Sequence, residues 1–406
     1  MNRWLFFWRQ LNRKLWVRAS LYAMLGVAVA IAAVVARPVV PAELARRFGG
    51  ESVEAILTIL ASSMLAVTTF SLGAMVTAYT AVSQAASPRV SQLVTGDPMT
   101  QKALATFVGA FLYAVVGVTA INAGYYGAEG RAVIFFCSLA VVGLVAFRLL
   151  SWVDRLSRLA RVGHMIELVE GLTREAMAQQ ARAPVGRADD TAFARGRAVL
   201  SRETGYVQNV DWNDLDDIAC QTDGRIQVVA PPGRFVRVDE PLCRLSAKPA
   251  DEGLAERVRR AFSVGATRSF DQDARYGLVV LGEIAGKALS PGINDPGTAV
   301  QVIATAVRLM DEWARREWVA DPACRIVNAP LGEADMLDDV FGPTMRYGAE
   351  DFVVAARLQK ALRSLAAAPG PLAQAARTLA DEALDRSRRL MGSEADRARL
   401  DAAARA

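Results

Sequence analysis

The chain has 406 residues, of which 52% are hydrophobic and 22% are charged, and its mean hydropathy is +0.20. Its charge is unevenly divided, because residues 1–165 hold 15 basic and 6 acidic side chains whereas residues 166–406 hold 32 and 36. The excess positive charge lies beside apolar runs, which excludes a nucleic-acid-binding protein, and one His with four widely spaced Cys argues against a zinc or haem enzyme.

The basic front half predicts a transmembrane domain of residues 1–153. Residues 19–36 are 18 consecutive uncharged positions, close to the roughly 20 that a bilayer crossing requires. Further apolar runs predict spans at residues 55–82, 103–126 and 132–153. We therefore expect an α-helical integral membrane protein with four transmembrane helices in contact with membrane lipid.

The distribution of Lys and Arg predicts the orientation of these spans. The N-terminus and the flanks after the second and fourth spans hold 11 of these residues, and the two alternate loops hold 4. Positive residues favour the cytoplasmic side. We expect a bacterial inner-membrane protein with both termini, and its soluble half, in the cytoplasm.

The second span carries small and hydroxyl side chains that recur mostly at helical spacings and so share one face. Such a face lines either a hydrated path in an oligomer or a tight helix–helix contact. Glu54, at the outer mouth, forms either a cation-attracting ring in a symmetric assembly or a first-turn carboxylate favoured by the helix dipole. The residues of the face are Thr58, Ser62, Thr69, Gly73, Thr77, Thr80 and Ser83.

The back half predicts a cytoplasmic α+β region. Residues 154–200 indicate a helical stalk and linker, and residues 201–247 a small β domain, since short alternating runs are separated by Pro- and Gly-rich turns. Its layout resembles the barrel-sandwich of biotinyl and lipoyl carrier domains. The carrier lysine has no counterpart, so we expect no cofactor. Residues 248–406 predict a helical domain.

One motif stands out in this helical domain. Gln272 and Asp273 precede a helix expected over 276–289, and Asp295 with Pro296 forms a helix start for 296–318. The remaining turn residues are Ser290, Pro291 and Asn294. Capping explains the motif structurally, whereas its oxygen atoms together with Asp271 and Glu283 suit a hard cation, so the metal question stays open.

Several stretches resemble one family of bacterial predicted membrane proteins, domain of unknown function 2254. They include TTFSLGAMVTAYTAVSQAASPRV in the second span, Thr204–Gln208, and QDARYGLVVLGEIAGKALSPGINDPGTAV around the motif. The resemblance covers about residues 1–370. It implies a multi-span inner-membrane protein with a cytoplasmic C-terminal region, and it assigns no activity to any residue.

Two functions follow from these patterns. The first is an oligomeric, channel-like conduit for ions or small solutes, with the second helix lining the path and a cytoplasmic domain for assembly or gating. The second is a membrane-anchored sensor or scaffold whose cytoplasmic domain binds a partner or small ligand. We expect a homo-oligomer that is not an enzyme, since the sequence contains no nucleotide loop, nucleophile elbow or metal signature.

Overall fold

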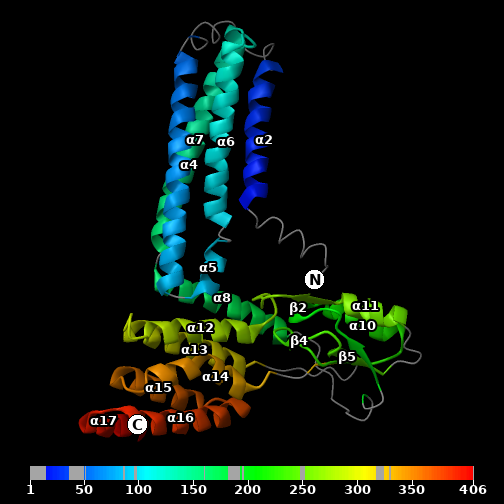
Figure 1. Cartoon of the computed structure of the whole chain (residues 1–406), viewed down its shortest axis with the longest axis vertical. Coiled ribbons are helices and arrows are strands. Elements are labelled where there is room, and N and C mark those ends of the chain that lie inside the picture. Colours follow the sequence, from blue (N-terminus) through cyan, green and yellow to red (C-terminus); the bar gives the residue numbers. More distant parts are fainter. Residues whose placement is uncertain are drawn as a thin grey trace. The chain divides into compact units, whose positions relative to one another are not determined.

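The computed structural model describes residues 15–35, 50, 52–85, 87–95, 98–159, 161–181, 193, 196–246, 252–316, 324–328 and 331–405. The chain divides into two compact units, drawn in Figure 1. The bundle unit contains the described residues between 15 and 84 and between 88 and 161. The C-terminal unit contains the described residues from Val162 onward, together with Ala85 and Ser87. Within the predicted stalk and linker, residues 182–192 lie outside the described residues.

The described part of the bundle unit is helical. Its elements are α2 (Leu15–Val35), α4 (Ser52–Ala85), α5 (Pro88–Thr95), α6 (Pro98–Asn122) and α7 (Ala128–Leu159). Three stretches are long and apolar enough to cross a membrane: Ser52–Gln84, Met99–Asn122 and Ala128–Leu156. These match the second, third and fourth predicted spans. The first predicted span falls in α2, where the apolar stretch among the described residues is only Ser20–Val29, so a fourth crossing stays a prediction.

Glycine brings α2 and α6 into direct backbone contact. A Cβ atom on Gly26 would lie 2.6 Å from the carbonyl oxygen of Gly109, and one on Gly109 would lie 2.8 Å from that of Tyr22. Small residues at such crossings allow two apolar helices to approach closely. Large buried side chains fill the remaining interior, among them Leu57, Phe107, Tyr113, Ile134 and Trp152.

The C-terminal unit contains two small sheets. One has the strand order β1-β5-β3-β7 and the other β4-β2-β6. Helix α10 (Trp212–Gln221) follows β2, and α11 (Glu252–Arg260) precedes β6. The strands are β1 (Arg197–Leu200), β2 (Gly205–Val210), β3 (Ile226–Val228), β4 (Phe235–Val236), β5 (Pro241–Leu245), β6 (Phe262–Gly265) and β7 (Ile326–Asn328).

The predicted barrel-sandwich over 201–247 is not confirmed. The two sheets also take in β1, β6 and β7, which lie outside that range, and β7 pairs with β3 in parallel with Val327 opposite Gln227. Turn residues mark where a strand begins and ends, but they carry no information on a partner strand far along the chain. For this reason, the sequence indicated the strands near residues 205–245 and not their partners.

The remaining described elements of the C-terminal unit are helices, although β6 and β7 also fall within the predicted helical domain of residues 248–406. A turn follows α12, as the sequence predicts. Helix α12 ends just before the predicted residue 289, and α13 ends before the predicted residue 318. The helices are α8 (Val162–Ala181), α12 (Ala274–Ala288), α13 (Pro296–Ala314), α14 (Glu333–Tyr347), α15 (Phe352–Leu365), α16 (Pro371–Leu390) and α17 (Glu394–Arg405).

A network of ion pairs fixes α8 to α13. Glu170, which is 7% exposed, accepts hydrogen bonds from Arg308 Nη2 at 2.7 Å and from Arg174 Nη2 at 2.8 Å. Arg174 Nε also donates to Glu312 at 2.9 Å. The hydrogen bonds from Arg308, with help from Arg174, hold the pKa of Glu170 below its usual range, although burial by itself would raise it. The helix that directly follows α7 in the chain is thus bound firmly within the C-terminal unit.

Candidate functional site

The predicted hydroxyl face lies on the exposed side of α4 within the bundle unit. Thr58, Ser62, Thr69, Gly73, Thr77 and Thr80 are exposed, and Ser83 is half-buried. At about 100° per residue, these positions fall on one side of the helix. The same exposed side of α4 also carries large apolar side chains, among them Ile59 at 67%, Phe70 at 72% and Val76 at 56% exposed.

The opposite side of α4 packs into the bundle. Its buried residues include Val53, Leu57, Leu60, Met64 and Val82. Leu57 approaches α6 at Gly117, where a Cβ atom would lie 3.1 Å from the Leu57 Cδ1 atom. The buried side of α4 thus packs within the bundle, and its exposed side carries the hydroxyl residues together with apolar side chains such as Ile59, Phe70 and Val76.

Four of the exposed hydroxyl groups donate to carbonyl groups of their own helix. Ser62 Oγ donates to Thr58 at 3.0 Å and Thr69 Oγ1 to Leu65 at 3.0 Å. Thr77 Oγ1 likewise donates to Gly73 at 3.1 Å, and Thr80 Oγ1 to Val76 at 3.0 Å. Each of these four hydroxyl oxygens keeps a lone pair that can accept a further hydrogen bond. These residues therefore present acceptors while their own O–H groups are already bonded, which suits both cation solvation and dry helix packing.

The exposed side of α7 is apolar, like the part of the exposed side of α4 formed by Ile59, Phe70 and Val76. It displays large apolar side chains, such as Leu139 at 61%, Phe147 at 64% and Leu150 at 72% exposed. Such a surface suits lipid tails, whereas a hydroxyl face is less favourable there. Glu54 is half-buried in the first turn of α4, at the edge of the hydroxyl face. This position is compatible with a cation-attracting ring in a symmetric assembly and with a first-turn carboxylate that the helix dipole favours.

Gln272 and Asp273 connect the sheets to the helices of the C-terminal unit. The Gln272 amide accepts from the Val210 N–H at 2.8 Å and donates to the Val210 carbonyl at 3.1 Å, as a neighbouring strand would. Asp273 caps α12 by accepting from the Tyr276 N–H at 3.0 Å. The two residues thus set where α12 begins relative to β2.

The Asp273 carboxylate is buried and paired. Arg268 donates to it from Nε at 2.7 Å and from Nη2 at 2.9 Å. Burial raises the pKa of Asp273, and the guanidinium of Arg268 offsets part of that rise. Gly233, at φ +91°, packs against the carboxylate so closely that a Cβ atom would overlap it. These contacts account for Asp273 without a ligand.

The second half of the motif forms the turn between α12 and α13. Ser290 Oγ donates to the Lys287 carbonyl at 2.6 Å, and Asn294 adopts a left-handed conformation at φ +49°. Asp295 caps α13, as the sequence predicts, by accepting from the Thr298 N–H at 3.1 Å, with Pro296 at the helix start. The Thr298 hydroxyl and N–H hold the pKa of Asp295 below its usual range. Pro291 is exposed.

The motif acids have separate partners. Asp271 accepts from Ser269 Oγ at 2.6 Å, and Glu283 accepts from Ser87 Oγ at 2.9 Å. Among the residues that the structure describes, no group of three or more His, Cys, Asp or Glu side chains could hold a metal ion. The described motif is thus accounted for by capping and packing contacts.

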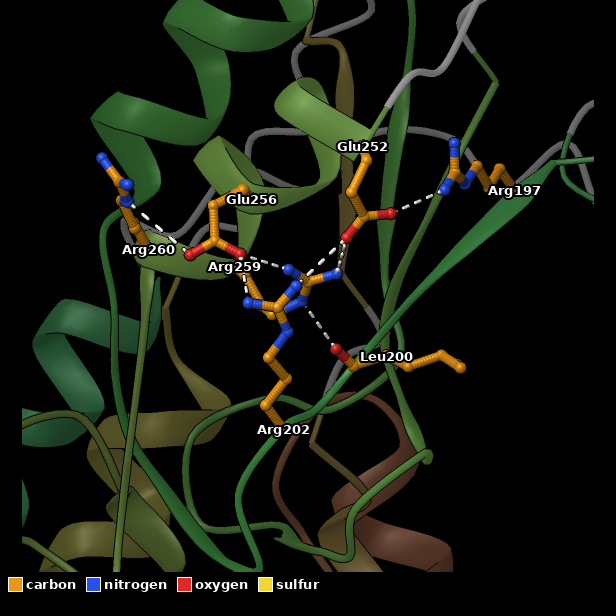
Figure 2. Close-up of polar contacts among 7 residues, drawn as sticks. All are labelled: Arg197, Leu200, Arg202, Glu252, Glu256, Arg259 and Arg260. Atoms are coloured by element: carbon orange, nitrogen blue, oxygen red, sulfur yellow. Dashed lines mark hydrogen bonds and ion pairs between the residues drawn. The ribbon is translucent and has the colours of Figure 1, made fainter.

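An arginine–glutamate cluster, shown in Figure 2, joins α11 to β1 and is not predicted from the sequence. Arg259, only 14% exposed, donates to Glu252 at 3.0 Å, to Glu256, and to the Leu200 carbonyl at 3.0 Å. Arg197 pairs with Glu252 at 2.9 Å. The helical spacing of Glu252, Glu256 and Arg259 could have signalled the local pairs, but not the contact with β1.

The comparisons with known proteins agree with the apolar helices of the bundle unit. A family model described as predicted membrane protein (DUF2254) matches residues 12–364. Uncharacterized proteins of Mycobacterium bovis and of Mycobacterium tuberculosis strain H37Rv are each 34% identical over 110 residues. The alignments cover 26% of this chain and 21% of each relative, so the chain matches about a fifth of the length of these curated relatives. No solved structure matches the chain.

Proposed function

We propose, from the premise that this chain belongs to the DUF2254 family of predicted membrane proteins, that it forms an oligomeric conduit for ions or small solutes. In this proposal, the hydroxyl face of α4 lines the path, and the C-terminal unit lies in the cytoplasm of a bacterial cell and controls assembly or opening. The role is not enzymatic.

One observation carries this proposal, namely the exposed position of the hydroxyl face within a single chain. An exposed helix face in a bilayer meets lipid, another protein surface or water. Large apolar residues cover the exposed side of α7, whereas the exposed side of α4 combines apolar side chains such as Ile59, Phe70 and Val76 with hydroxyl groups that can accept hydrogen bonds. Second copies arranged around an axis would remove this face from lipid and give a path lined by hydroxyl oxygen atoms.

A second candidate function is a membrane-anchored scaffold or sensor, and one observation favours it. The hydroxyl groups at Ser62, Thr69 and Thr77 are already bonded within their own helix, so the face can pack against another helix without water. The spans would then only hold copies together, and the C-terminal unit would bind a partner or small ligand.

Ion flux through liposomes that contain the purified full-length chain distinguishes the two functions. The conduit predicts flux above that of empty vesicles, and it predicts that Thr69→Leu with Thr77→Leu reduces this flux at least tenfold. Ala81→Leu is the matched control, because it adds comparable bulk to an exposed position of α4 outside the hydroxyl face. Control and double variant should be reconstituted at the same protein-to-lipid ratio.

The conduit and the scaffold predict different results in this flux assay. Flux that is lost in the double variant and kept in the control supports the conduit. Wild-type vesicles that conduct no better than empty ones, across both membrane polarities and several ions, would leave the scaffold as the better account. Cross-linking of wild-type protein in the same vesicles tests whether copies associate, which both functions require.

A further inference from the structure

We propose that Arg148 and Trp152 of α7 bind the phosphate group of a membrane phospholipid at the surface of the bundle unit. This site goes beyond the conduit proposed above and does not depend on it, because it lies on α7 and not along the hydroxyl face of α4. All the residues that form it belong to the bundle unit.

Arg148 lies at the end of an uncharged stretch within the apolar part of α7, Ala128–Leu156. Residues 132–147 are 16 consecutive uncharged positions between Arg131 and Arg148. They span about 24 Å at 1.5 Å per residue, and the hydrocarbon core of a bilayer is about 30 Å thick. With Arg131 near one boundary of the hydrocarbon, Arg148 therefore comes close to the other, beside a layer of phospholipid phosphate groups.

The described helices of the bundle unit place no carboxylate next to Arg148. Glu54 is in the first turn of α4, and Glu129 precedes Arg148 by 19 residues, or about 28 Å along the helix axis. Asp154 follows six residues after Arg148, about 120° away around the helix. The acidic residues of these helices are Glu54, Glu129 and Asp154. A charged side chain within an apolar span normally has a partner, so an anion from outside these helices is needed.

Two donors on this side of α7 are buried without a hydrogen-bond partner among the residues that the structure describes. They are Nε of Arg148 and Nε1 of Trp152, a residue that is 1% exposed. Residues four apart are neighbours on one face of a helix. The Arg148 side chain as a whole is half-buried, so it reaches the surface of the unit. This place thus combines a positive charge with two N–H donors and lacks acceptors, which a phosphate group supplies.

The surface beside Arg148 fits the acyl chains of the same molecule. Leu144, four residues earlier and on the same face, is 45% exposed, and Phe147 and Leu150 are 64% and 72% exposed. Such side chains favour contact with lipid tails over contact with water. An apolar surface that ends at a guanidinium matches an amphipathic molecule with a phosphate head, because the planar fork of Arg donors fits phosphate oxygen atoms. A phospholipid has both parts.

Binding of phosphatidylglycerol to the purified full-length chain, in a detergent without phosphate, tests the site without any need for conduction. Native mass spectrometry counts the bound lipid across a titration. Arg148→Gln should raise the lipid concentration for half-saturation of the tightest site at least tenfold, and Arg148→Lys should recover part of this loss because it keeps the charge. Trp152→Phe keeps a ring without the N–H and should raise the same concentration at least twofold.

Arg346→Gln is the matched control, because it removes an exposed arginine from α14 of the C-terminal unit. It should bind the lipid as wild type does. Thermal unfolding gives an independent measurement, since a ligand that binds the folded chain raises its melting temperature. Without lipid, Arg148→Gln should be at least as stable as wild type, and it should lose the stabilisation that phosphatidylglycerol gives to wild type. Lower stability without lipid would show that the guanidinium has a partner inside the protein and would overturn the site.

Two further ligands identify the source of the phosphate. Phosphatidylcholine, whose choline neutralises the head group, should bind at least threefold more weakly than phosphatidylglycerol. Inorganic phosphate has no acyl chains and should not displace the lipid at millimolar concentrations; displacement by it would overturn the assignment to a phospholipid. Equal lipid binding by wild type and Arg148→Gln would overturn the site itself. A change of oligomeric state in Arg148→Gln without lipid would also overturn it, because the guanidinium would then pair with a second copy.

Discussion

Gln272 and Asp273 are adjacent in the chain, and together they connect strand β2 to helix α12. The Gln272 amide satisfies both backbone groups of Val210, which would otherwise need a neighbouring strand. The next residue begins α12 by capping it, and its buried carboxylate is paired with Arg268. The sequence singled out both residues, but it indicated only that they precede a helix, because the partner at Val210 lies 62 residues away.

Glu170 should make the stability of the C-terminal unit depend on pH in the acidic range. Its pKa is lowered in the folded chain, so the stabilisation it provides is complete above the unfolded pKa of about 4.3 and is lost as the pH falls through the folded value. Glu170→Gln should cost about 1 kcal/mol at pH 7, because both arginine partners are partly exposed to solvent.

Denaturant unfolding of wild type and Glu170→Gln between pH 7 and pH 3 measures this effect. The difference between the two proteins should shrink as the pH falls below about 4. Glu175→Gln, at an exposed position of the same helix, should track wild type at every pH. A Glu170→Gln deficit that is independent of pH would instead indicate a packing effect.

At the scale of helices and strands, features set by residues close in sequence were predictable, whereas pairings between distant segments were not. The start of α13 was predictable, because Asp295, Pro296 and Thr298 form its cap within four residues. The apolar periodicity of α4 was also sufficient to group its hydroxyl residues on one side. The three-residue strand β7 was not predictable, since its place in the sheet depends on β3 and on buried contacts far along the chain.

The crossing of α2 and α6 should be sensitive to a single methyl group. Gly109→Ala places a Cβ atom 2.8 Å from the Tyr22 carbonyl oxygen, so the two helices must separate. We expect a loss of about 1–3 kcal/mol in the unfolding free energy of the bundle unit. Gly143→Ala in α7 is the control, because no atom lies within 4 Å of the new Cβ position.

Unfolding in mixed detergent micelles, followed by circular dichroism, measures both variants. Equal stability of Gly109→Ala and Gly143→Ala would show that α2 does not pack on α6 as described.

For the whole molecule, the division into two units predicts two unfolding transitions. Each unit has its own core, with Trp152 in the bundle unit and Trp313 in the C-terminal unit. Chains with more than one unit generally do not unfold in one step. Gly109→Ala should shift only the transition of the bundle unit, and Glu170→Gln only that of the C-terminal unit. One cooperative transition that both variants shift together would contradict this prediction.

The hydrogen bond between Ser87 and Glu283 also has a consequence for the order of biosynthesis. The two residues are 196 positions apart, so at typical elongation rates roughly 10 to 40 s pass between their translation. The polypeptide around α4 and α6 therefore leaves the ribosome long before α12 exists. Newly made protein must pass through a stage in which the Glu283 carboxylate that accepts from Ser87 has not yet been made, and completion of the C-terminal unit is what ends that stage.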